Sequence, residues 1–208
     1  MSALPAALRD ALVIIADVAG DSAVCLVGGL AVSARTEPRF TRDVDLAVAV
    51  DDDPGAEAVV HAFSSRGWRV AAVVEHDSAG RMATARMQRP TSRGDAAVMV
   101  DLLFASSGIE GDIVRAAESL VVMPSLTVRT ASVGHLLVMK LLAVDARRQQ
   151  DGIDIERLLE VATSGDLEQA RLAAQDVVAR GFGRGRDLVT MLDLAVTKGR
   201  EAGWLASG

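Results

Sequence analysis

The chain has 208 residues, half of them hydrophobic, which is enough for one domain or for one core with a helical appendage. A net charge of −6 argues against a protein that binds nucleic acid over its whole surface, although it is compatible with a local basic patch. Cys25 is the only cysteine, so an intrachain disulfide is excluded. No run of about 18 apolar residues is free of charge, so we expect no membrane span and a cytoplasmic location.

The N-terminal part of the sequence alternates helical and strand patterns. Leucines at helical spacing predict a helix over residues 3–19, and Asp10 and Asp17 within it distinguish it from a signal peptide. A short buried strand is expected next, then a Gly28-Gly29 turn, a helix and a second strand. The ranges are 23–27 for the first strand, 30–35 for the helix and 43–50 for the second strand, with another helix beginning near Pro54.

The middle of the sequence predicts two consecutive hairpins, and the end is helical. The hairpin strands are expected at 68–75, 81–88 and 96–104, followed by a helix at 109–119 and a strand at 120–123. Ser132 is a candidate N-cap for an apolar helix that runs to about Arg147, and 153–204 is helical with breaks at Gly165 and 181–185. We therefore expect an α+β fold: a mixed sheet flanked by helices in residues 1–130, then a helical region at 131–208 packed on that core.

Two carboxylates mark the second strand as a candidate metal site. Asp43 and Asp45 are two residues apart, so in a strand both project to one face while Val44 and Leu46 take the other. Adjacent carboxylates repel each other unless a cation lies between them, and Mg²⁺ prefers oxygen ligands and keeps places for substrate phosphate. The alternative is that Asp43 pairs with a nearby arginine.

Asp101 is the natural third acid, because it interrupts an otherwise apolar strand pattern. A carboxylate there is costly to bury unless it is paired or bound to metal. If its strand lies beside that of Asp43 and Asp45, the three acids could hold two Mg²⁺ ions, and Asp101 could activate an acceptor hydroxyl. The alternative is that Asp101 merely ends a strand.

Gly28-Gly29 follows a strand and opens a helix, which is a suitable place for phosphate to approach backbone N–H groups. Arg39 or Arg42 could neutralise a triphosphate, and we favour Arg39. Thr41 could cap the strand entry through its hydroxyl.

Lys140 is one of only two lysines and lies in a strongly apolar helix, where a buried ammonium needs an anionic partner. It could bind triphosphate oxygens, or it could extend to the surface. Arg147 is two helical turns further on and is predicted on the same face. Asp151 and Asp154 could orient Lys140 or Arg147, or could simply be acids in the first turn of a helix.

Together, Gly28-Gly29, the series Arg39-x-Thr41-x-Asp43-x-Asp45, and Asp101 resemble the DNA polymerase β-like nucleotidyltransferase superfamily. The later Lys140, Arg147, Asp151 and Asp154 resemble its toxin-type members from toxin–antitoxin and abortive-infection systems. Many superfamily members have Gly-Ser in place of Gly28-Gly29, and other toxin-type members have Thr where this chain has Leu30, so a phosphate-binding hydroxyl is missing here.

This resemblance implies Mg²⁺-dependent transfer of a nucleotide from a nucleoside triphosphate to an acceptor hydroxyl on RNA, tRNA or protein. It implies Asp43, Asp45 and Asp101 as metal-binding and catalytic residues, with Gly28, Gly29, Arg39, Thr41 and Lys140 as nucleotide-binding residues. A cognate antitoxin is a further expected partner. Two alternatives stay open: an aminoglycoside-type drug-modifying enzyme, and a non-catalytic module that binds a nucleotide or a partner.

Overall fold

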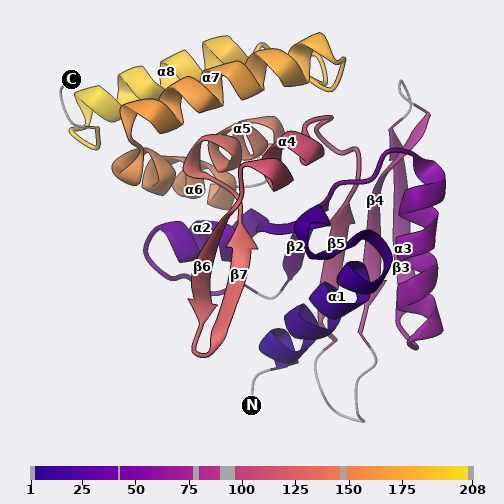
Figure 1. The fold of residues 1–208 in the computed structure, drawn as a ribbon. Coiled ribbons are helices and arrows are strands. Elements are labelled where there is room, and N and C mark those ends of the chain that lie inside the picture. The colour runs from indigo at the N-terminus through magenta and orange to yellow at the C-terminus, as the bar shows by residue number, and fades with distance from the viewer. Residues whose placement is uncertain (1–2, 42, 77–79, 90–96, 146–148, 206–208) are drawn as a thin grey trace.

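A mixed seven-stranded sheet organises the protein (Figure 1). A computed structural model describes residues 3–41, 43–76, 80–89, 97–145 and 149–205. The strand order is β3-β4-β5-β2-β1-β7-β6, with β2–β5 and β1–β7 parallel and the other pairs antiparallel. The strands are β1 (Val24–Val27), β2 (Val44–Val48), β3 (Arg69–His76), β4 (Arg81–Gln88), β5 (Met99–Leu103), β6 (Glu118–Met123) and β7 (Leu126–Thr130).

Helices lie against the sheet and stack beyond it. In Figure 1, α7 and α8 form an outer layer above α5 and α6, while α1 and α3 contact each other and the sheet. The α-helices are α1 (Ala3–Ala19), α2 (Gly28–Arg35), α3 (Asp53–Ser65), α4 (Glu110–Arg115), α5 (Val133–Ala143), α6 (Gln149–Val161), α7 (Ser164–Ala179) and α8 (Leu188–Glu201), and a 3-10 turn, η1, spans Asp21–Ala23. This arrangement confirms the expected α+β class.

The two faces of the sheet differ around β4 and β5. Ala83, Ala85 and Met87 of β4 are buried on the side where α1 and α3 pack, whereas the alternating Thr84 and Arg86 are more accessible. Alternation of this kind follows from the two-residue period of a strand. The open side is the one that carries Arg86 and its cross-strand partner Asp101.

Most predicted elements are confirmed, with some boundaries corrected. β2 begins at Val44, so Asp43 immediately precedes the strand instead of lying in it. The strand β7 was not predicted; it pairs with β6 across a tight turn in which Ser125 has a φ of 61°. Buried and exposed residues alternate along its five positions, but so short an alternation is not recognisable in the sequence next to the apolar helix that follows.

The helical end of the chain also differs in detail. Ser132 caps α5 as expected, but the helix ends at Ala143 and not near Arg147, which lies outside the described residues. Gly165 is not a break: it lies in the first turn of α7, which begins with a capping box formed by Thr163 and Asp166.

One hydrophobic cluster runs through the sheet and the C-terminal helices. It joins Leu26 and Leu46 of the sheet to Leu137 of α5, Leu158 of α6 and Val177 of α7, all fully buried. The division into residues 1–130 and 131–208 stays a prediction. Within the described ranges, none of the helices combines the length and apolar character that a membrane crossing requires.

Candidate active site

The sheet topology brings two of the predicted acids together. β2 and β5 are parallel neighbours, and their register sets Asp45 directly opposite Asp101. Adjacent strands are only about 4.8 Å apart, so residues in register are near neighbours on one face. Asp43 precedes β2, and its main-chain oxygen accepts a hydrogen bond of 3.4 Å from the hydroxyl of Thr41. The expected adjacency of the two strands is therefore confirmed.

Gly28 and Gly29 lie against this acidic pair at the start of α2. Gly28 has a φ of 64°, which favours glycine, and a methyl group in place of its hydrogen would lie 1.9 Å from Oδ2 of Asp45. A methyl group on Gly29 would lie 2.6 Å from Nη2 of Arg39. The first helical residues thus need to be glycine, because any side chain would displace Asp45 or Arg39.

Asp45 is held in an environment that resists its ionisation. Burial, and then the neighbouring Asp101, raise the pKa of Asp45 to about 6; Asp43 also raises it, whereas Lys140 and the backbone N–H of Gly29 act in the opposite direction. The local negative charge is therefore not fully balanced by the protein. A bound cation would supply the missing positive charge.

Arg86 is a site residue that the sequence did not reveal. It is the cross-strand partner of Asp101, and its Nε and Nη2 donate to the two carboxylate oxygens at 2.7 and 2.5 Å. This bidentate pair raises the pKa of Arg86, although burial acts against the shift. In sequence, Arg86 looks like an ordinary polar position on the open face of a strand, and only the pairing of β4 with β5 gives it a role.

The ammonium of Lys140 is held between two acids of α6. Its Nζ lies 2.8 Å from Oδ1 of Asp151 and 2.8 Å from Oδ2 of Asp154. The expectation of an anionic partner for Lys140 is confirmed, and extension to the surface is not observed. Asp151 and Asp154 lie in the first turns of α6 and both contact Lys140, whereas the alternative partner Arg147 lies outside the described residues.

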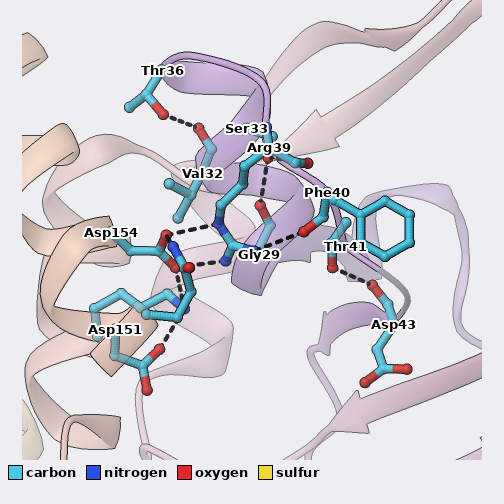
Figure 2. Close-up of polar contacts among 12 residues, drawn as sticks. Gly29, Val32, Ser33, Thr36, Arg39, Phe40, Thr41, Asp43, Asp151 and Asp154 are labelled. Atoms are coloured by element: carbon cyan, nitrogen blue, oxygen red, sulfur yellow. Dashed lines mark hydrogen bonds and ion pairs between the residues drawn. The ribbon is translucent and has the colours of Figure 1, made fainter. Parts of the chain in front are cut away.

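Asp154 also holds Arg39, as Figure 2 shows. Nε and Nη2 of Arg39 donate to the two oxygens of this fully buried carboxylate at 2.8 and 2.7 Å, and Gln150 adds a third contact at 3.1 Å. Burial alone would raise the pKa of Asp154, but the hydrogen bonds from Arg39 and Lys140 outweigh burial and lower it. Arg39 and Lys140 therefore share Asp154 as a partner.

A cavity of about 450 Å³ connects these groups. Gly28, Asp45, Lys140 and Asp151 line it, and its volume is within the usual range for small-molecule sites. A larger hollow of about 630 Å³ lies by the far end of β2, at Asp51, and contains none of the candidate residues. The larger hollow would be taken as the active site if volume were the criterion. The charged side chains converge on the smaller cavity, so we assign the active site there.

The donor chemistry of the three acids suits a hard cation such as Mg²⁺, which binds carboxylate oxygens. Among the described residues, however, no three acidic, histidine or cysteine side chains are already arranged as a ligand set. Both oxygens of Asp101 accept hydrogen bonds from Arg86. The residues fit a divalent ion by type and by their unbalanced charge, and an ion at Asp101 would share its oxygens with Arg86.

Similarity to known proteins bears on the family of the chain. Two solved structures from Helicobacter pylori share 13% identity with the chain: JHP933, with a TM-score of 0.44 over 98% of this chain and 96% of the other, and a protein provisionally described as a nucleotidyltransferase, with a TM-score of 0.45 over 97% and 99%. No curated protein matches the chain. The profile of the family described as "Nucleotidyl transferase AbiEii toxin, Type IV TA system" matches residues 10–204. Since that match spans nearly the whole sequence, the chain belongs to the AbiEii nucleotidyltransferase toxin family.

Proposed function

We propose that this nucleotidyltransferase uses Mg²⁺ to transfer a nucleoside monophosphate from a nucleoside triphosphate to a hydroxyl group of RNA. The observation that carries the proposal is the register of β2 and β5, which sets Asp45 opposite Asp101 beside the Gly28-Gly29 helix start. Membership of a nucleotidyltransferase toxin family supports the reaction type and leaves the acceptor to be identified.

In this proposal each acid has a distinct role. Asp43 and Asp45 would hold two Mg²⁺ ions, and Asp101 would hold the one beside the acceptor. Bound Mg²⁺ would polarise the phosphate oxygens and neutralise charge on the leaving group. Backbone N–H groups at the start of α2 would bind phosphate oxygens, because glycine lets them approach closely.

The chemical step exchanges a phosphoanhydride bond of the triphosphate for a phosphoester bond to the acceptor. The acceptor oxygen forms a bond to the α-phosphorus, the bond from that phosphorus to the bridging oxygen breaks, and pyrophosphate leaves. Asp101 accepts the proton of the acceptor hydroxyl. Arg86 donates one hydrogen bond to each oxygen of Asp101, and the second acceptor site on each oxygen is the one that takes the proton.

Lys140 and Arg39 supply positive charge for the triphosphate. Lys140 lines the cavity with Gly28 and Asp45, so its ammonium can reach a phosphate there. The guanidinium of Arg39 lies where a side chain on Gly29 would be, so it is beside the start of α2. Asp154 contacts both side chains and fixes their positions, so we assign it an orienting role.

The proposed surroundings of the reaction follow from its substrates. Nucleoside triphosphates and RNA are abundant in the cytoplasm, where we expect the protein to act. A type IV toxin family implies a cognate antitoxin, and we expect one for this chain. A protein hydroxyl and a cationic aminoglycoside are the acceptors that compete with RNA, the second because the chain carries a net charge of −6.

The test is a transfer assay with nucleoside triphosphates labelled at the α-phosphate. Each of the four is incubated with the protein and Mg²⁺, in parallel with total RNA, a protein extract and aminoglycosides. We expect label in RNA, no transfer in EDTA, and transfer below detection for Asp45→Asn. Asp51→Asn is the matched control, since this exposed aspartate lies beyond the other end of the same strand and should leave transfer unchanged.

The three acceptors make the outcomes distinct. Label on protein or on aminoglycoside alone would replace RNA as the acceptor and keep the reaction. Absence of label from every acceptor, or full activity of a folded Asp45→Asn protein, would overturn the assignment of the acids.

A further inference from the structure

We propose that two copies of the protein associate through strand β3, which pairs with β3 of the second copy in antiparallel orientation. The result is a two-fold dimer in which the sheet of one copy continues into the sheet of the other. This association does not depend on the reaction that the protein catalyses.

The outer edge of β3 has no partner strand within the described residues. β3 is the first strand in the sheet order and pairs with β4 alone (Figure 1). The main-chain N–H and C=O groups that point away from β4 therefore form an open row, and a row of this kind can pair with a strand of another chain. Edge strands often prevent such pairing with charged side chains along their length.

The side chains of β3 are apolar along most of this edge. Residues 69–75 are all exposed, and the five in the middle are valine or alanine. Val70, Val73 and Val74 are 45%, 46% and 56% exposed. In the described ranges no other helix or strand carries three large apolar side chains that are exposed, so those of β3 form a patch. A contiguous apolar patch marks a contact surface.

The charges at the two ends of the patch favour a second copy as the partner. Arg69 begins the exposed segment and Glu75 ends it, with Ala72 at the midpoint. In an antiparallel pair centred on Ala72, Arg69 of each copy lies opposite Glu75 of the other. Val70 lies opposite Val74 in the same register. The segment is therefore complementary to itself, as an isologous two-fold interface requires.

The geometry of β3 also ends the assembly at two copies. Each copy has one β3 edge, and a two-fold contact uses both edges, so none stays open for a third copy. The register of β3 against β4 shifts between Val70 and Ala72. A bulge of this kind interrupts the regular edge and limits the paired segment to a few residues, which disfavours open-ended stacking.

The contact lies beside the active site. Val74 lines the cavity of about 450 Å³ that Gly28, Asp45 and Lys140 also line. A second copy at β3 therefore stands next to this cavity, which connects the oligomeric state to the access of a large acceptor.

The experiment is sedimentation velocity on the purified full chain over a range of concentrations. We expect a species of twice the 21.8 kDa mass of the chain, and Val73→Lys should convert it to monomer. Val121→Lys is the matched control, because Val121 is 71% exposed on β6 at the other edge of the same sheet and should leave the dimer intact. Circular dichroism checks that each variant is folded.

Charge variants test the antiparallel register. Arg69→Glu and Glu75→Arg each place like charges opposite each other at both ends of the pair, so each should raise the Kd of the dimer by about tenfold. An equimolar mixture of these two variants should form a mixed dimer with a Kd close to that of the wild type, because glutamates of one copy then face arginines of the other. The double variant that carries both substitutions should recover in the same way.

Three outcomes would overturn the proposal. The first is a wild type that stays monomeric up to its highest soluble concentration. The second is a dimer that withstands Val73→Lys, and the third is a pair of charge variants that do not recover when they are mixed. None of these outcomes bears on nucleotidyl transfer, which the transfer assay tests separately.

Discussion

Asp45 shows how one residue combines a cost to the fold with a proposed role in binding metal. It is next to Asp101 across the strand pair and close to Asp43, and burial leaves its charge poorly solvated. A fold that keeps such a group retains a local instability that a cation would relieve. Stability and Mg²⁺ binding should therefore be linked at this position.

The prediction concerns Asp45→Asn in metal-free protein. The pKa of Asp45 rises from 3.8 in the unfolded chain to about 6 in the fold, so between these values the native state binds more protons and the contribution of this residue to stability falls as pH rises. Asn removes that loss, and the variant should be more stable than the wild type at pH 7.5 by up to about 3 kcal/mol.

Urea denaturation in EDTA at pH 4 and pH 7.5 measures this difference. The advantage of Asn should shrink toward pH 4, and added Mg²⁺ should stabilise the wild type but not the variant. A wild type that is more stable than Asp45→Asn at pH 7.5 without metal would contradict the electrostatic account.

Arg86 should compete with Mg²⁺ for Asp101. Replacing it with glutamine removes the positive charge from the carboxylate, so the half-saturating Mg²⁺ concentration should fall several-fold, as followed by thermal shift. Arg81→Gln is the control, because Arg81 lies on the same strand and pairs with Asp53 at 3.6 Å. A higher Mg²⁺ requirement in Arg86→Gln would mean that Arg86 prepares Asp101 for the metal instead of competing with it.

At the scale of elements, α6 holds the cations of the site in place. Its first turns bring Asp151 and Asp154 to Lys140 of α5, and Asp154 reaches Arg39 in the segment between α2 and β2. A single helix therefore connects parts of the chain that are distant in sequence. The carboxylate at its centre is fully buried, so the charges of this network depend on one another.

Asp154→Asn should destabilise the fold by roughly 3 kcal/mol, because it leaves two cations without a shared carboxylate. Chemical denaturation at pH 7.5 gives the value, and Glu160→Gln on the exposed side of α6 is the control for loss of charge. Since the pKa of Asp154 is lowered in the fold, its contribution should be lost as pH falls, and the two proteins should converge in acid. Equal stability of the wild type and Asp154→Asn would contradict a structural role for the network.

At the scale of the whole molecule, the sheet and the C-terminal helices share one hydrophobic cluster. We predict a single cooperative unfolding transition, since neither part can expose its side of the cluster without the other. The two tryptophans report separately: Trp68 packs against Phe63 beside the sheet, and Trp204 follows α8. Each single-tryptophan variant, Trp204→Phe or Trp68→Phe, reports unfolding around the tryptophan that it keeps. The unfolding midpoint measured by its fluorescence should equal the midpoint measured by circular dichroism on the same protein. Separated midpoints within either variant would establish independent units.

Patterns within short segments predicted much of this protein. Apolar spacing predicted α1 and most strands, and the lone charges Asp101 and Lys140 in apolar runs identified one buried and one partly buried group that need partners. These signals can be read from a short segment alone. A charge in an apolar run costs free energy to bury whichever part of the protein the run packs against. The resemblance of the spaced acids and glycines to nucleotidyltransferases agreed with the family of the chain.

Other features depend on contacts between distant segments. The partner of Asp101 could not be predicted, because Arg86 has the pattern of a surface residue until β4 pairs with β5. The central place of Asp154 was equally hidden, since an acid in the first turns of a helix is common and unremarkable.

The sequence by itself determined the class of fold and singled out the acids and the glycine turn as candidates, because each depends on the chemistry of a few neighbouring residues, and its resemblance to a known superfamily indicated the reaction type. Only the tertiary structure decided which side chains meet: Asp45 with Asp101, Asp101 with Arg86, and Arg39 with Asp154. The physical reason is that strand order and helix packing are set by burial of the whole hydrophobic core, and the register that results places charges that no local pattern relates.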